Sequence, residues 1–354
     1  MKKNKSKKLE LKLALVIVMV LIVIMIILLI FKQKIGAVSS ELTQEDMRYD
    51  KYYVLIADES DDVLWESVYA GAVQAGMEEN IYVEMIQEGD GIEYTLQEKM
   101  RIAIDSKVDG IILSADGEEE TTLLINEAVE KNISVVTALN DDTQSLKQCF
   151  VGVNDYSFGE EYGKLIWECI LKNEEEQDTY TVSVLMDSSN TDTGKNTTYL
   201  GIKEYLETQS KLEEVAFEVI IKTVAMDRSD TFSSEETIRD IIFDGTTDII
   251  VCLNSTDTDA AYRSVVDYNE VGSLEIIGYY ETKDILEAID KKIIEASITI
   301  DGGEVGSQCV RALLEYQETG FVSGYFSVNT YVLNQDNVAE YLRIYEEESE
   351  DEDE

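Results

Sequence analysis

Residues 108–139 read VDGIILSADGEEETTLLINEAVEKNISVVTAL and contain a complete strand–helix–strand unit. The runs 108–115 and 133–139 are short, apolar and rich in β-branched residues, whereas 119–131 has the length and apolar spacing of an amphipathic helix. Apolar strands on either side of a helix indicate a parallel sheet that helices cover on both faces. The stretch therefore predicts an α/β fold.

The same alternation continues through the chain from residue 52 to residue 280. Strands are predicted at 52–58, 81–86, 108–115, 133–139, 149–153, 181–187, 215–224, 247–254 and 274–280. Helices are predicted at 65–80, 93–106, 119–131, 156–173, 194–209, 233–243 and 257–270. Crossovers between parallel strands are right-handed, and a single core rarely exceeds about 250–300 residues, so we expect two doubly wound parallel-sheet lobes.

Residues 13–31, LALVIVMVLIVIMIILLIF, form an uncharged apolar run of the length that a helix needs to cross a bilayer. Six lysines precede this run and fewer basic residues follow it, which predicts a cytoplasmic N-terminus and an extracellular or periplasmic main domain. A cleaved signal peptide, cut near Ala37-Val38-Ser39, is the alternative. The run is longer than the roughly 7–15 apolar residues of a signal peptide, so we expect an uncleaved anchor in the cell membrane.

Composition excludes several classes of function. The formal net charge of −44 disfavours nucleic-acid binding, because phosphates repel such a surface. The chain contains no His, which removes the commonest general base and zinc ligand. Cys149, Cys169, Cys252 and Cys309 lie among apolar residues without C-x-x-C spacing, which indicates buried thiols, although a disulfide outside the cell stays open. We expect no nucleic-acid partner, no cofactor and no metal.

Ligands of doubly wound sheets bind outside the carboxyl ends of the strands, which makes the residues after each predicted strand candidates for a site. They are rich in Asn, Asp, Ser and Tyr, which hydrogen-bond to hydroxyl groups, and Trp65, Tyr279 and Tyr280 could stack on a ligand. The candidates are 58–62, 114–116, 140–141, 154–155, 187–190, 226–228, 254–255 and 279–281. At any single position, capping of the following helix is the competing interpretation.

Four segments, 108–139, VGVNDYSFGEEYGKLI (151–166), TDIIVCLNSTDTDAAYRSV (247–265) and LEIIGYYE (274–281), together resemble the type I periplasmic sugar-binding proteins, the ribose- and galactose-binding group. The resemblance covers about Tyr52 to Asn334. It implies two α/β lobes, joined by a hinge of three crossover strands, that close on a small polar solute. Regulators of the lac-repressor type share this fold but carry a helix-turn-helix headpiece where this chain has the apolar run.

The resemblance also implies ligand-binding positions. It places Asp62 and Trp65 where the family has an Asn and a ring-stacking aromatic, and Asn140 within a frequent Asp-Arg pair. Asn154 and Asp155 stand where Asp-Asn is common. The remaining positions are Asn196 in place of an Arg, Asn254 matching an Asn, and Tyr280 in place of an Asp.

These departures imply that the fold of the family is retained while the residues that bind the sugar have changed. A site built for one pattern of hydroxyls rejects ligands that leave its polar groups unpaired, so the changes indicate a different ligand or none. Because both arginines are missing and carboxylates remain, an amine-bearing solute held by carboxylates and aromatic rings is one interpretation.

The predicted organisation has six parts. They are a cytoplasmic basic segment at 1–12, a transmembrane helix at 13–31, a stalk at 32–50, an N-terminal lobe of 51–153 with about 301–322, a C-terminal lobe of 154–300 with about 323–345, and a disordered acidic tail at 346–354.

The leading hypothesis is a membrane-anchored extracellular solute-binding protein that delivers a sugar-like, in one interpretation amine-bearing, ligand to an ABC importer. The alternative is a ligand-sensing accessory of a transmembrane kinase or chemoreceptor. An enzyme is disfavoured, because the chain has no His, no G-x-S-x-G and no P-loop pattern, and nothing indicates two carboxylates facing each other across a bond. The pair Asp257 and Asp259 lacks the spacing of a calcium loop.

Overall fold

The computed structural model describes residues 49–57, 63–86, 94–172, 177–187, 193–226 and 231–352. Contacts divide the chain into Met1–Tyr49 and Asp50–Glu354, and all described strands and helices belong to the second unit. None of the described helices combines the length and the apolar character that a membrane crossing requires. The predicted span at 13–31 lies outside the described residues and stays a prediction.

The first sheet is entirely parallel, as the apolar strand–helix alternation predicts. Its strand order is β11-β5-β4-β3-β1-β2, and the register runs from Lys51↔Ile81 between β1 and β2 and from Tyr53↔Gly110 between β1 and β3. The strands are β1 (Lys51–Ile56), β2 (Ile81–Met85), β3 (Gly110–Leu113), β4 (Ser134–Ala138), β5 (Cys149–Gly152) and β11 (Tyr325–Ser327).

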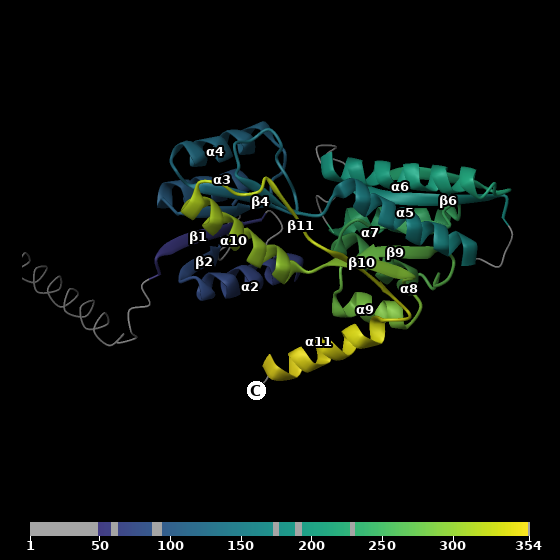
Figure 1. Cartoon of the computed structure of the whole chain (residues 1–354). Coiled ribbons are helices and arrows are strands. Elements are labelled where there is room, and N and C mark those ends of the chain that lie inside the picture. The colour runs from purple at the N-terminus through teal and green to yellow at the C-terminus, as the bar shows by residue number, and fades with distance from the viewer. Residues whose placement is uncertain are drawn as a thin grey trace, which may run out of the picture. The chain divides into compact units, whose positions relative to one another are not determined.

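Helices cover both faces of this sheet, which with them forms the first lobe (Figure 1). They are α2 (Val63–Glu78), α3 (Leu96–Ser106), α4 (Glu119–Glu130) and α10 (Gly302–Thr319). Alternate side chains of β1 point to opposite faces: Tyr53 and Leu55 pack with α2 and α10, whereas Val54 and Ile56 pack with α3 and α4. Both faces are therefore buried, which explains why the strands are apolar throughout.

The second sheet repeats this plan and forms the second lobe. Its order is β12-β10-β9-β8-β6-β7, with β12 antiparallel to β10 and the remaining pairs parallel. The strands are β6 (Thr179–Asp187), β7 (Glu218–Met226), β8 (Ile249–Val251), β9 (Glu275–Tyr279), β10 (Ala296–Ile300) and β12 (Thr330–Asn334). Each strand and helix predicted between residues 52 and 280 is present, with small shifts at the ends.

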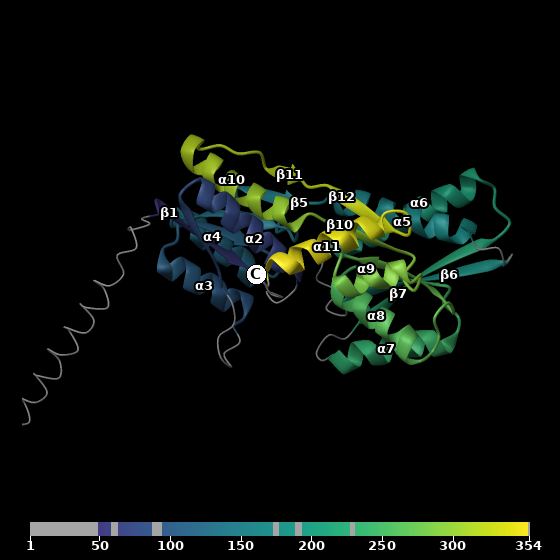
Figure 2. The same ribbon diagram turned by 90° about the horizontal axis from the view of Figure 1, so that it is seen from below.

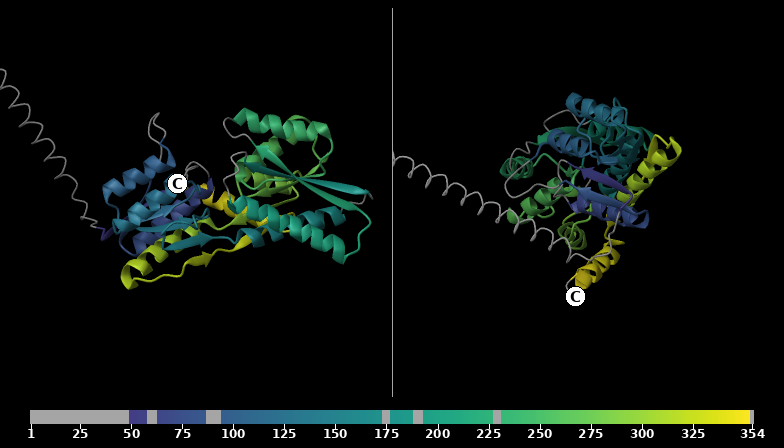
Figure 3. Two further views of the ribbon diagram at one scale, coloured as in Figure 1. Left: turned by 90° about the horizontal axis from the view of Figure 1, so that it is seen from above. Right: turned by 90° about the vertical axis from the view of Figure 1, so that its left-hand side faces the viewer.

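Two layers of helices enclose the second sheet. They are α5 (Asp155–Lys172), α6 (Thr193–Leu212), α7 (Thr231–Asp244), α8 (Ser255–Asp267), α9 (Lys283–Asp290) and α11 (Val338–Glu352). Val182 and Val184 of β6 pack with α5 and α6, while Leu185 packs with α7, α8 and α9. Figure 3 shows α5 and α6 on one side of β6 and β7, and α7 on the other.

Each lobe contains one pair of helices that meet at glycines. In the first lobe, α10 lies beside α2 although the two helices are far apart in sequence (Figures 1 and 2), and a Cβ at Gly306 would lie 1.9 Å from the Val68 carbonyl oxygen. In the second lobe, a Cβ at Gly159 of α5 would lie 2.1 Å from the Thr198 carbonyl oxygen of α6. Only glycine permits these backbones to approach so closely.

Three connections join the lobes: from β5 to α5, from β10 to α10 and from β11 to β12. The first two lie at the predicted boundaries, between 153 and 154 and between 300 and 301. The predicted return to the second lobe at about 323 is wrong for residues 325–327, because β11 pairs with β5 of the first lobe, with Tyr325 opposite Phe150. A strand of three residues is too short for its sequence pattern to indicate its partner.

The predicted disorder from residue 346 is also wrong for most of the acidic segment, since α11 continues to Glu352. Glu has a high helix propensity, and the helix begins at Val338, whose side chain is buried in the second lobe together with side chains of α9. Residues 353–354 lie outside the described residues.

Candidate functional site

The carboxyl ends of the parallel strands form one edge in each lobe, and the described site candidates follow these ends. In the first lobe, Asn140 comes two residues after β4; Asn154 comes two residues after β5, where the chain enters the second lobe. In the second lobe, Asn254 and Tyr280 follow β8 and β9. Asp62 lies outside the described residues, so its role stays a prediction.

Asn140 links two strand ends in the first lobe. Its side-chain amide donates to the Ser114 hydroxyl at 3.1 Å, and its carbonyl accepts from the Ala115 N–H at 3.2 Å. The residue is exposed, and it follows Leu139, whose φ is +62°. Asn140 is therefore held in place by its neighbours and still accessible to a solute.

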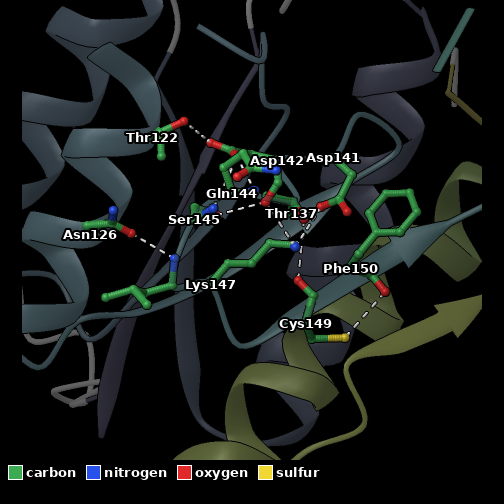
Figure 4. A network of polar contacts seen from close by, with 11 residues as sticks. Thr122, Asn126, Thr137, Asp141, Asp142, Gln144, Ser145, Lys147, Cys149 and Phe150 are labelled. Atoms are coloured by element: carbon green, nitrogen blue, oxygen red, sulfur yellow. Dashed lines mark hydrogen bonds and ion pairs between the residues drawn. The ribbon is translucent and has the colours of Figure 1, made fainter. Parts of the chain in front are cut away.

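Polar contacts hold the loop that follows Asn140 (Figure 4). Asp142 is buried, and its carboxylate accepts from the Thr122 hydroxyl at 2.6 Å and from the Gln144 and Ser145 N–H groups at 2.9 and 3.1 Å. Lys147 Nζ lies 3.0 Å from Asp141 Oδ1 in a half-buried ion pair. Both carboxylates are engaged within the loop, so Asp141 and Asp142 support the edge of the sheet.

Asn254 caps α8 through a reciprocal contact. Its Oδ1 accepts from the Asp257 N–H at 2.7 Å, and its Nδ2 donates to Asp257 Oδ2 at 2.6 Å. Asp257 is completely buried, whereas Asn254 is half-buried. The capping interpretation is thus correct for Asn254, and a ligand could reach only what the cap leaves exposed.

Asn154 has a similar role at the start of α5. Its Oδ1 accepts from the Ser157 N–H at 2.9 Å, and the side chain is exposed. Asp155 is half-buried in the first turn of the same helix, and Asn196 is exposed in the first turn of α6. These three polar residues remain accessible in the second lobe.

The predicted stacking residues differ in exposure. Trp65 is only 7% exposed in the core of the first lobe, and Tyr280 is only 4% exposed. Tyr279 is half-buried and meets the Phe158 ring edge-on, with centroids 6.0 Å apart. Trp65 is buried because it lies on the apolar face by which α2 packs into the core. Of the three, Tyr279 is therefore the aromatic side chain that a ligand could best reach.

Tyr162 of α5 supports the carboxyl ends of the strands in the second lobe. Its hydroxyl lies 3.1 Å from the carbonyl oxygens of both Cys252 and Gly278, at the ends of β8 and β9. Complete burial raises the pKa of this hydroxyl well above 10.0, so it stays protonated and shares its one proton between the two carbonyls.

One cation in the first lobe was not predicted as a site residue. Lys99 in the first turn of α3 is completely buried, and its Nζ donates to the Ala57 carbonyl oxygen at 3.0 Å. Ala57 is the first residue after β1. The sequence signal was a lysine within the buried helix face formed by Leu96, Met100 and Ala103.

Other groups offer no competing site. Within the described ranges, no cluster of three or more acidic or cysteine side chains could hold a metal ion. The four cysteines are free and buried, as predicted, and burial raises the pKa of both Cys149 and Cys169 to about 12. Two hollows of about 230 and 380 Å³ lie between helices, one between α9 and α11 and one between α3 and α4.

The chain belongs to the periplasmic binding protein family. The family model described as "Periplasmic binding protein domain" matches residues 52–320, which is most of the chain. The comparison with curated proteins found no match.

Solved structures share the fold. GanP, a glucose-galactose binding protein from Geobacillus stearothermophilus, is 21% identical with a TM-score of 0.71, covering 82% of this chain and 99% of that chain. A sugar-binding protein of a sugar ABC transporter from Bacillus halodurans is 21% identical with a TM-score of 0.69, covering 82% and 100%. XylFII in the XylFII-LytSN complex is 22% identical with a TM-score of 0.66, covering 81% and 98%. At these identities the likeness establishes the fold.

Proposed function

We propose that this chain is a solute receptor whose two lobes close on a small polar, sugar-like ligand. Its membership of the periplasmic binding protein family over residues 52–320 is the observation that carries the proposal, and the sugar-binding proteins that share its fold suggest the class of ligand. The accessible amides of Asn140 and Asn154 and the half-buried Asn254 and Tyr279 support it, because such groups bind hydroxyls and sugar rings.

In the proposed mechanism, the three connections between the lobes act as a hinge. A few residues at the ends of elements can absorb the rotation of a lobe, while each packed core moves as a unit. Asn140 would bind the ligand from the first lobe, and Asn154, Asn254 and Tyr279 from the second. Binding involves no chemical conversion of the ligand, so the proposed protein is a receptor and not an enzyme.

The proposed partner of the closed form is an ABC importer. One structural neighbour is a sugar-binding protein of a sugar ABC transporter, which favours import over the sensing alternative. The apolar run at 13–31 would anchor the receptor, with its lobes outside the cell. Anchoring raises the local concentration of the receptor beside a permease.

The test is a thermal-shift screen of the full-length protein against neutral sugars, polyols, amino sugars, sugar acids, nucleosides and polyamines. A ligand at 100 times its dissociation constant should stabilise the fold by about 2.7 kcal/mol. Absence of a shift with every compound would contradict the proposal.

A matched pair of variants tests the site. Asn140→Ala should abolish the ligand-induced shift, whereas Asn126→Ala should retain it. Asn126 is an asparagine of the same lobe whose Oδ1 accepts one hydrogen bond, from the Leu146 N–H at 2.7 Å on the α4 side of the loop. Equal losses in the two variants would contradict a ligand role for Asn140.

A further inference from the structure

Lys99 is the only lysine or arginine with a buried side chain among the described residues, and its exposed fraction is 0%. The buried face of α3 consists of Leu96, Lys99, Met100, Ala103 and Ile104. This spacing is that of a core-facing apolar stripe, so Lys99 occupies a position where a Leu or Met would be the stabilising choice.

The ammonium group of Lys99 is incompletely paired. It has three N–H donors, and the hydrogen bond within the described part of the chain goes to the Ala57 carbonyl oxygen. No carboxylate of the described residues forms an ion pair with it. Burial of an ammonium without a carboxylate costs stability, and such departures from the packing rules concentrate at functional sites.

Lys99 lies at the ligand-binding edge of the first lobe. Ala57 immediately follows β1, and the Ile56 carbonyl before it still belongs to the sheet, accepting from the Ser114 N–H at 2.9 Å. Helix α3 begins close to Lys99, with Thr95 as its N-cap, and its N-terminus adds a partial positive charge. Asp116, a carboxylate after β3, is engaged by the Gln97 amide at 2.8 Å and the Glu118 N–H at 2.9 Å.

We propose that Lys99 is a specificity-determining residue that makes the first lobe select a sugar bearing a carboxylate, such as a uronate. This inference rests on the proposed function. A charge buried at the edge of a sheet is poorly screened by salt, so it favours an anionic group nearby even in a chain with a net charge of −44. Because Lys99 belongs to the first lobe, the carboxylate of the ligand should face that lobe.

This ligand class differs from the amine-bearing solute that composition indicated. The amino-acid composition does not distinguish carboxylates that could bind a ligand from those with partners in the protein. Asp142 and Asp257 belong to the second kind, since they form hydrogen bonds in a loop and in a helix cap. A buried cation with spare donors outweighs exposed carboxylates, because interactions in the low-dielectric interior are stronger.

The experiment measures dissociation constants of the full-length protein by calorimetry for two matched sets: galactose, galacturonate and galactosamine, and glucose, glucuronate and glucosamine. In at least one set the uronate should bind at least 10-fold more tightly than the neutral sugar, and the amino sugar should bind most weakly. Lys99→Met and Lys99→Gln should both bring the ratio of uronate to neutral sugar close to one. Gln retains a donor for the Ala57 carbonyl without the charge, so a preference that survives only in Lys99→Gln would overturn the charge-based role.

Lys131→Met is the matched control, because it removes an exposed lysine of the same lobe, paired with Glu127 at 2.7 Å, and should leave the ratio unchanged. Lys99→Met should not lower the melting temperature, since an apolar side chain suits the buried stripe. A lower melting temperature with an unchanged ratio would identify Lys99 as a structural counter-charge. Binding of neutral sugars without preference, or of none of the six compounds, would overturn this inference alone. Absence of a shift with the whole thermal-shift panel would overturn it together with the proposed function.

Discussion

Leu139 and Tyr280 occupy equivalent places in the two lobes and share an unusual backbone conformation. Leu139 follows β4 with φ of +62°, and Tyr280 follows β9 with φ of +73°. Each donates its N–H to the next strand of its sheet, Leu139 to the Val151 carbonyl at 2.9 Å and Tyr280 to the Ile298 carbonyl at 2.8 Å. Non-glycine residues rarely adopt this region, and such strain concentrates where a ligand is bound. The two lobes thus turn the chain in the same way at the predicted ligand-binding edge.

The strain at Leu139 predicts an inverted order of stability for two truncations. Gly normally destabilises by about 0.5–1 kcal/mol relative to Ala, but at a positive φ the Cβ itself is unfavourable by roughly 1–2 kcal/mol. Leu139→Gly should therefore be more stable than Leu139→Ala by about 1 kcal/mol in urea unfolding. At the preceding residue, in β4, Ala138→Gly should destabilise as usual. A Gly variant at 139 that is less stable than the Ala variant would refute the strain.

Removal of the Tyr162 hydroxyl should destabilise the second lobe. Tyr162→Phe leaves the Cys252 and Gly278 carbonyls without this donor in a dry environment, at a cost of about 1–3 kcal/mol. The control is Tyr156→Phe, because its hydroxyl donates to Glu204 at 2.7 Å on the surface, and its effect should stay within about 0.5 kcal/mol. Similar effects of both changes in denaturant unfolding would count against this support of the strand ends.

A single methyl group at the α2–α10 contact should weaken the first lobe. Gly306→Ala places a Cβ 1.9 Å from the Val68 carbonyl oxygen, so the helices must separate at a cost of roughly 1–3 kcal/mol or more. Gly324→Ala is the matched control, since nothing lies within 4 Å of its added Cβ. Thermal unfolding of both variants gives the comparison, and an unchanged melting temperature for Gly306→Ala would show that the helices are not in such close contact.

Capping and ligand binding can be separated at Asn254. Asn254→Ala removes the cap of α8 and should cost about 1 kcal/mol of unfolding free energy without ligand. Asn254→Ser retains a capping oxygen and should unfold close to wild type. If Asn254 also binds ligand, both variants should lose ligand-induced stabilisation equally. Normal stabilisation of Asn254→Ser by a ligand would restrict this residue to capping.

Buried thiols should make the fold less stable in alkali. Burial raises the pKa of Cys149 and Cys169 from 9.0 to about 12, so between these pH values the unfolded chain loses protons that the native state keeps. Stability is therefore fully present below pH 9 and is lost as the pH rises towards 12. From pH 8 to pH 10 the loss should be about 1 kcal/mol per thiol, and Cys169→Ala should reduce it by that amount in urea unfolding. An identical loss in the variant would contradict the shift.

The positions of most candidate site residues at strand ends could be predicted from sequence, but their contacts could not. The rule that ligands bind beyond strand ends made Asn140, Asn154 and Asn254 candidates, and the structure places all three after strand ends, because these ends are visible as the limits of apolar runs. The contacts of these side chains depend on residues far away in sequence. The sequence gives Trp65 and Tyr279 the same standing as aromatic residues near strand ends. The structure shows that Trp65 is buried by the packing of α2, whereas Tyr279 is half-buried.

The sequence by itself determined the alternation of strands and helices, the two lobes and the family, because the period of apolar residues records which faces each element buries. The tertiary structure alone decided that β11 joins the first sheet, that Lys99 is buried beneath β1, and that Leu139 and Tyr280 turn with positive φ. These features arise from contacts between distant segments, and the free energy of such contacts depends on neighbours that no local pattern records.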